Sequence, residues 1–306
     1  MAPGDLLRLL LSLVAYAASF PVLEALLDPV GGGGVPPLAF GAVRHACAGV
    51  LLGGIAASRG VRILAPGAGP WGVRLAPWGI LAVFATEATQ NYGFTRTSAS
   101  VASLLQSGAG VPAALAGVVL FRERLTRGKA AGLVLASLAL VAFFSPDLEA
   151  PGVTAAGNLL MCGTALAYAG ADVYGKHLLG SGVSPLRLVT HGHLLGAALL
   201  LGASACVEVS PWGSFAHARV WGALAFLVLG PGIFAALMWL DVLSRLPVSV
   251  VAPMGCLMPL LVSAMSWALL GERMTPAQLA AGGALLAGLW LLARPGRSLA
   301  LTSRAD

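Results

Sequence analysis

The sequence predicts an all-α integral membrane protein, with ten transmembrane helices arranged as two inverted five-helix repeats. Two observations predict this fold class. The chain is 58% hydrophobic and only 10% charged, whereas a soluble protein carries roughly a quarter charged residues. Most of this apolar surface must therefore face lipid. The second observation is an internal repeat that covers two apolar segments and the polar break between them.

The repeat is recognised by a group of residues that recurs in register 149 residues later. Arg96, Ser100, Val101, Leu120, Glu123, Arg124 and Thr126 align without gaps on Arg245, Ser249, Val250, Leu269, Glu272, Arg273 and Thr275. Similar apolar composition explains chance matches of Leu and Val, but it does not explain a Glu-Arg-x-Thr break at the same offset. We therefore expect a first repeat in residues 1–150, a second in 151–296 and a cytoplasmic tail in 297–306.

Ten apolar segments separated by turn or charge signals define the expected helices. Each has about 18–24 residues, which is enough to cross the hydrocarbon core of a bilayer. The expected ranges are 6–27, 36–57, 72–92, 98–120, 128–145, 153–175, 184–207, 219–240, 247–270 and 276–293. The breaks are too short to hold a soluble domain.

The N-terminal segment has a second interpretation, as a signal peptide. Arg8, the apolar run that follows and Ala15-Tyr16-Ala17 have the pattern of a leader with its cleavage site. Ala167-Tyr168-Ala169 echoes this tripeptide at the matching place in the second repeat. We therefore expect the segment to be part of the mature protein, as the first helix of its repeat.

Charge and cysteine content argue against several classes of function. The net charge of +6 comes from basic residues between the apolar segments, which form no single patch for nucleic acid. Cys47, Cys162, Cys206 and Cys256 lie inside apolar segments without CxxC spacing, so neither a disulfide framework nor a metal site is expected. No phosphate-binding motif is present, and we expect no cofactor.

Basic residues predict the orientation in the membrane. With the N-terminus cytoplasmic, all but four of the 18 Lys and Arg residues lie on or near the inner side, as the positive-inside rule requires. Arg96, Arg219 and Arg273 lie outside and Arg44 lies within a span. Five helices is an odd number, so the second repeat is inverted and both termini are cytoplasmic. Inverted repeats are typical of transporters.

The same residues carry a resemblance to a known family. Its marks are Arg44, the stretch from Gly157 through Ala167-Tyr168-Ala169 to Lys176, Pro259 before Leu270-Gly271-Glu272-Arg273-Met274-Thr275, and the weaker copy Phe121-Arg122-Glu123-Arg124-Leu125-Thr126. Over residues 6–293 the chain resembles the drug/metabolite transporter superfamily, of the ten-helix EamA type. The resemblance implies a secondary carrier that exports amino acids or other metabolites.

This chain departs from the family's pattern at two places. Tyr16 and Tyr168 stand where the family often has Trp. Pro112 lies two residues closer to Glu123 than Pro259 lies to Glu272, so the two prolines are not strict equivalents.

Charged residues inside the spans are candidates for gates, because a charge in the membrane is costly. Glu24, Arg44 and Glu87 fall at similar depth in the outer half. The repeat aligns Glu24 with Lys176 and Arg44 with His193, and Asp241 ends the eighth helix. We expect one polar gate per face, closing alternately. The alternative is that Glu24, Lys176 and Asp241 reach interfacial water.

The substrate is expected near the midplane, between the repeats. The candidate binding residues are Tyr16, Phe20, Tyr92, Gln106, Asn158, Tyr168 and Trp239. Aromatic walls with a few amides suit an apolar or zwitterionic solute and suit a phosphorylated solute poorly, since that needs clustered Arg and Lys. The aromatic residues can equally be ordinary packing residues. His191 and His193 can couple transport to protons or simply pack.

The leading hypothesis is a secondary transporter that exports amino acids, aromatic or large neutral, across the inner membrane of a bacterium. The alternative is a multidrug or other metabolite exporter. An intramembrane enzyme is a remote alternative, because Asp172 and Asp241 lie near helix ends and form no catalytic motif. The expected partners are a small-molecule substrate and membrane lipid, with no nucleic acid, and the chain can act as a monomer.

Overall fold

The protein was analysed as a computed structural model, which describes residues 1–28, 34–63, 71–123, 126–144, 153–209, 212–270 and 275–294. Every regular element in these residues is a helix. Seven of the described helical stretches are long and apolar enough to cross a membrane: 3–27, 37–58, 99–120, 185–207, 218–245, 248–265 and 276–293. Sufficient length and apolar content are the physical requirements for spanning a bilayer.

The helices follow the expected segments along the chain. In the first half they are α1 (Pro3–Leu27), α2 (Pro37–Ser58), α3 (Trp71–Gly79), the π-helix η1 (Ile80–Ala85), α4 (Thr86–Phe94), α5 (Ala99–Ser107), α6 (Gly110–Leu120) and α7 (Arg127–Phe144). In the second half they are α8 (Ala155–Gly180), α9 (Pro185–Val207), the short 3-10 helix η3 (Gly213–Ala216), α10 (Ala218–Leu227), the π-helix η4 (Val228–Ala235), α11 (Ala236–Arg245), α12 (Val248–Val251), the 3-10 helix η5 (Ala252–Cys256), α13 (Leu257–Leu270) and α14 (Pro276–Ala293).

Several expected helices are interrupted rather than regular. Segment 72–92 is α3, η1 and α4 in succession, and segment 219–240 is α10, η4 and α11. Pro231 lies inside η4 and lacks the N–H that a regular α-helix needs. Pro253 lies at the start of η5. Such interruptions release backbone carbonyls and are frequent at functional sites.

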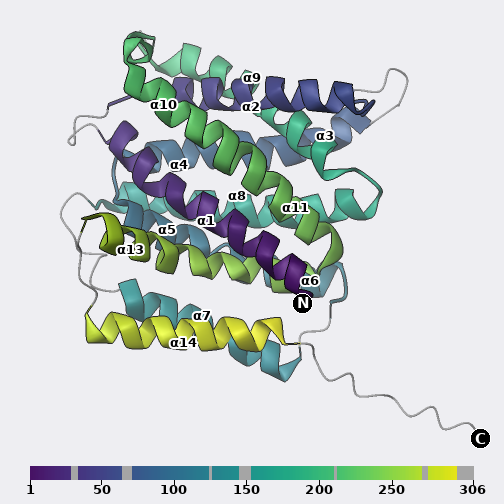
Figure 1. Ribbon diagram of the computed structural model, residues 1–306, viewed down its shortest axis with the longest axis vertical. Coiled ribbons are helices and arrows are strands. Elements are labelled where there is room, and N and C mark those ends of the chain that lie inside the picture. Colours follow the sequence, from purple (N-terminus) through teal and green to yellow (C-terminus); the bar gives the residue numbers. More distant parts are fainter. Residues whose placement is uncertain are drawn as a thin grey trace, which may run out of the picture.

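The helices pack in pairs that join the two halves of the chain (Figure 1). α2 lies along α9 at one end of the molecule and α7 lies along α14 at the other. Glycines allow the second pair to approach closely, because a Cβ at Gly132 would lie 2.6 Å from the Gly288 carbonyl oxygen. Close backbone approach at small residues is a usual way for membrane helices to associate.

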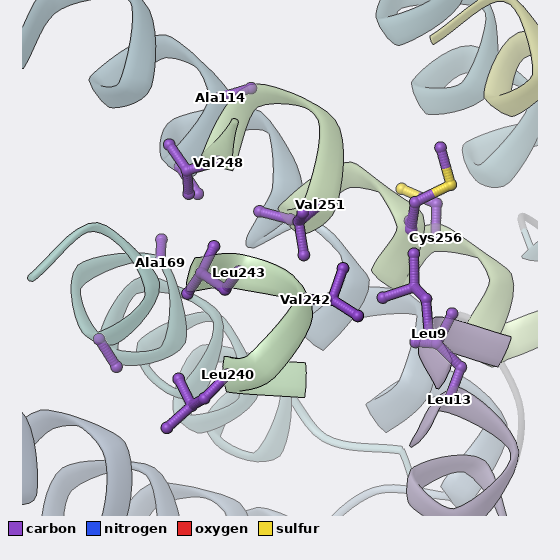
Figure 2. Close-up of a cluster of buried hydrophobic side chains, with 14 of the residues drawn as sticks. Leu9, Leu13, Ala114, Ala169, Leu240, Val242, Leu243, Val248, Val251 and Cys256 are labelled. Atoms are coloured by element: carbon purple, nitrogen blue, oxygen red, sulfur yellow. The ribbon is translucent and has the colours of Figure 1, made fainter. Parts of the chain in front are cut away.

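A buried apolar cluster connects the ends of α1, α11 and α12 (Figure 2). It includes Leu9 and Leu13 of α1, Leu243 of α11, and Val248 and Val251 of α12, all at most 1% exposed. These side chains are drawn from both halves, so the cluster fixes the halves against each other.

Two glutamates cap helices that belong to the opposite half. Glu123, which follows α6, accepts hydrogen bonds from the backbone N–H groups of Val248 and Ser249, both at 2.8 Å. Glu208, after α9, accepts from Leu38 N at 2.7 Å and Ala39 N at 2.9 Å. The first N–H groups of a helix have no partner within it and attract negative charge. Glu123 therefore has a structural reason to stand in the repeated break. Glu272, its counterpart, lies outside the described residues.

We predict that Glu123→Ala lowers the free energy of unfolding by about 1–2 kcal/mol, the usual cost of losing a helix cap. Glu123→Gln should cost less, because its amide oxygen still accepts a hydrogen bond. Thermal unfolding of the purified protein in detergent measures both. Asp241→Asn is the control, since the partly exposed ion pairs of Asp241 are worth about 0–1 kcal/mol. Equal stability of Glu123→Ala and wild type would contradict this role.

Candidate functional site

A cavity lies between the two halves of the bundle. About 1130 Å³ of space not filled by atoms lies in and around it, including open solvent at its mouth. Its walls come from α1, α2, the run from α3 to α4, α5 and α6 in the first half, and from α8, α9, η4, α11, η5 and α13 in the second. Pockets with mainly apolar walls and a few polar groups are typical of small-molecule binding sites.

One wall of the cavity is aromatic. Tyr16 and Phe20 of α1 face this space together with Tyr168 of α8 and Trp239 of α11. Phe20 also packs edge-on against Phe94, with ring centroids 5.7 Å apart. α1 and α8 each place a tyrosine on the cavity because Tyr16 and Tyr168 occupy matching places in the two repeats.

Gln106 is a buried amide that faces the same cavity. It is 5% exposed, lies within hydrogen-bonding reach of Tyr168, and its Oε1 atom has no partner among the described residues. A buried polar atom without a partner costs free energy. Gln106 is therefore a group that a ligand can satisfy.

Arg44 and Glu87 form a buried ion pair at the cavity. Arg44 Nη1 lies 3.0 Å from Glu87 Oε1 and 3.3 Å from Oε2, and the two residues are 6% and 3% exposed. Asn91 Nδ2 donates to Glu87 Oε2 at 3.2 Å and to the Pro37 carbonyl at 3.0 Å. The pair neutralises both charges away from water, and such a pair is stable only when its hydrogen bonds are well made.

Two histidines extend this ion pair across to the second half. His45 of α2 stacks on His193 of α9, with ring centroids 4.7 Å apart, and their Nδ1 atoms are hydrogen-bonded. His193 Nε2 lies 2.9 Å from the carbonyl oxygen of Gly232 in η4. A carbonyl only accepts, so this nitrogen carries hydrogen.

The far nitrogen of His45, Nε2, lies 3.2 Å from Glu87 Oε1. This contact is an ion pair when the imidazole of His45 is protonated. Glu87, His45 and His193 thus form a row of titratable groups that runs from α4 through α2 to α9.

Tyr92 and Asn158, two of the expected binding residues, lie outside the lining of this cavity. Tyr92 packs against a small apolar cluster that contains Leu38 and Leu200. Asn158 Oδ1 accepts a hydrogen bond from Thr97 at 3.3 Å. The structure therefore brings five of the seven expected binding residues together, Tyr16, Phe20, Gln106, Tyr168 and Trp239.

The sequence grouped Lys176, His193 and Asp241 in one gate, but the structure places these three residues in different surroundings. His193 lies with Arg44 and Glu87. Lys176 Nζ donates to the carbonyl oxygens of Leu243 and Leu246, each at 2.8 Å, at the end of α11. A cation is favourable there because the last carbonyls of a helix are partly negative.

Asp241 and Glu24, the remaining expected gate residues, also lie outside the cavity lining. Asp241 belongs to a charged cluster with Asp5, Arg8 and Arg245, where α1 begins and α11 ends. Glu24 is half-buried near the other end of α1.

Sequence reasoning missed His45 and Asp172. Asp172 lines the cavity and accepts a hydrogen bond from Trp239 Nε1 at 2.8 Å. It was placed near a helix end because the sixth helix was expected to stop at residue 175, but α8 continues to Gly180. A signal was present: Asp172 follows Tyr168 by four residues, and that spacing puts both on one helix face.

Comparison with known proteins agrees with these observations. The sequence model of the EamA-like transporter family matches twice, over residues 3–145 and 155–294. A probable amino-acid metabolite efflux pump of Salmonella typhimurium strain LT2 is 29% identical over 207 residues, which cover 60% of this chain and 68% of the relative.

A solved crystal structure of another protein shares the fold. It superposes with a TM-score of 0.72 over 92% of this chain and 96% of its own, at 20% sequence identity. The family matches together span most of the chain and the described helices include seven that can cross a membrane. The chain therefore belongs to the EamA-like transporter family of the drug/metabolite transporter superfamily and is a multi-pass membrane protein.

Proposed function

We propose that this transporter exports amino acids, aromatic or large neutral, across the inner membrane of a bacterium by alternating access. One observation carries the proposal: the cavity is lined by aromatic side chains from both halves together with the unsatisfied amide of Gln106. The name of the Salmonella relative supports export of amino-acid metabolites. Multidrug export is the alternative that the same aromatic walls would serve.

The proposed architecture is ten spans in two inverted halves. Besides the seven apolar stretches, the spans are Trp71–Phe94, Arg127–Phe144 and Ala155–Gly180. With 26 residues α8 is about 39 Å long, enough to cross a bilayer core. α7 lies along α14. In this arrangement both termini are cytoplasmic, which accords with the positions of the basic residues.

The pairing of helices supports a symmetric exchange of the halves. The second expected span packs on the seventh (α2 on α9), the fourth on the ninth (α6 on α12) and the fifth on the tenth (α7 on α14). The first packs on the eighth and the third on the sixth (α1 on α11, α4 on α8). An internal twofold axis would exchange each span of the first half with the corresponding span of the second half. Under that exchange three of these pairings are unchanged, and the other two replace each other.

Two charged clusters are the proposed gates. One is Arg44 and Glu87 with His45 and His193. The other is Asp241 with Arg8 and Arg245, where Lys176 also ties α8 to the end of α11. Both clusters join elements of the two halves. Breaking one while the other stays closed would open the cavity to one side of the membrane at a time.

We predict saturable counterflow when proteoliposomes are loaded with an unlabelled aromatic or large neutral amino acid and supplied with the labelled one. Gln106→Leu should reduce exchange about tenfold or more, because the apolar side chain leaves a substrate hydrogen bond unmade. Asn158→Leu is the matched control, since Asn158 lies outside the cavity lining. It should leave the affinity for substrate unchanged.

An absence of counterflow with every amino acid, in vesicles shown to contain folded protein, would exclude amino-acid export. The same vesicles should then be tested with cationic and neutral drugs. Saturable drug exchange would establish the multidrug alternative.

We predict that Arg44→Gln and Glu87→Gln each destabilise the protein by about 3–5 kcal/mol, because each leaves a buried charge unpaired. The exchanged pair Arg44→Glu with Glu87→Arg should recover folded protein and counterflow. The neutral pair Arg44→Gln with Glu87→Gln should recover stability without gated exchange. Melting temperature and counterflow, measured on the same preparations, separate the two roles. If the exchanged pair rescues neither quantity, these residues do not form a gate.

A further inference from the structure

Asp172 is an acidic side chain in the cavity that forms no ion pair with a basic residue in the described part of the chain. It lies on α8 between the aromatic wall and α11, and Trp239 Nε1 donates its hydrogen bond at 2.8 Å. Within the described part of the chain no Lys or Arg forms an ion pair with it. A carboxylate removed from bulk water without a cation is costly, so a positively charged group that binds beside Asp172 would be stabilised.

No Lys or Arg described as lining the cavity is available to neutralise Asp172. Arg44 is the one Lys or Arg among the residues described as lining the cavity, and Glu87 already pairs with it at 3.0 Å. Their charges cancel, so with His45 and His193 neutral an ionised Asp172 gives the cavity an excess of one negative charge. The arrangement favours a ligand with at least one positive charge.

The hydrogen-bonding groups near Asp172 point to the same kind of ligand. Gln106 Oε1 is a buried acceptor without a partner among the described residues. Asp172 is close enough to Tyr16 and Tyr168 to act on both electrostatically. An ammonium group offers three N–H donors and no acceptor. The faces of tyrosine and tryptophan rings attract a cation as well.

We propose that Asp172 is the receptor for a substrate ammonium group, and that the cavity takes primary amines that carry an aromatic or large apolar body. The inference rests on the proposed transport function and names its substrate class. The ammonium group binds Asp172 and the acceptor atom of Gln106, while the apolar body packs on the aromatic wall. A carboxylate on the substrate is not required, because Glu87 occupies the arginine that would bind it.

The decisive experiment is binding to purified protein in detergent, measured with three congeners that share a phenylethyl body. 2-Phenylethylamine has only the ammonium group, phenylalanine has both charged groups, and 3-phenylpropionate has only the carboxylate. Competition against labelled 2-phenylethylamine should rank the amine and the amino acid far above the acid. Asp172→Asn should weaken amine binding roughly tenfold or more, the range for a hydrogen bond to a charged group.

Asparagine keeps an oxygen for the Trp239 hydrogen bond, so Asp172→Asn is expected to fold, and its melting curve checks this. Asp172→Glu restores the charge and should recover part of the affinity. Asp28→Asn is the matched control, because Asp28 lies at the end of α1 and outside the cavity lining. It removes a carboxylate of the same size and should leave amine affinity unchanged.

Three outcomes would overturn the proposal: no amine binding by the wild type, equal competition by 3-phenylpropionate, or unchanged amine affinity in folded Asp172→Asn. This test can also fail or succeed independently of the test of the transport function. Amino-acid counterflow that persists unchanged in Asp172→Asn would refute the ammonium site and keep the exporter. Amine binding that depends on Asp172, without any amino-acid exchange, would support the site and refute amino-acid export.

Discussion

The Arg44–Glu87 ion pair is the interaction on which the rest of the site depends. A charge within a membrane span is costly, so each of these residues is stable there only with the other. The requirement that they meet fixes α2 against α4. His45 follows Arg44 directly, and its contact with His193 then fixes α2 against α9 of the second half. One pair of charges thus sets the packing of three helices around the cavity.

Backbone chemistry explains where the polar contacts between the halves occur. A helix satisfies its own polar groups except at its ends and at irregular turns. The joins between the halves use those places: the start of α12 receives Glu123, and the start of α2 receives Glu208. Contacts of this kind are made by single groups at helix ends, so they can be exchanged without disturbing the apolar packing between them.

Sequence reasoning reached the helical fold and the grouping of Arg44 with Glu87, because both depend on quantities that sequence contains: segment length, apolar content and depth. It placed Lys176 with His193, which the structure separates. Alignment of the repeats gives equivalent positions, whereas contacts depend on which way each side chain points around its helix. Asp172 was missed for a related reason, since a five-residue error in the end of α8 moved it from the cavity to an expected helix end.

The duplicated break illustrates the same distinction between position and contact. Glu123 recurs as Glu272 at the same offset as the rest of the repeat. The structural role of Glu123 is visible only in its hydrogen bonds to Val248 and Ser249 of the second half. In two inverted copies, equivalent spans run in opposite directions through the membrane. A carboxylate at the end of one span therefore lies on the same side of the membrane as the start of the equivalent span that packs against it. An acidic residue at that place can therefore cap the opposite copy. This gives a physical reason for the break to keep its glutamate in both repeats, independent of any substrate that the protein carries.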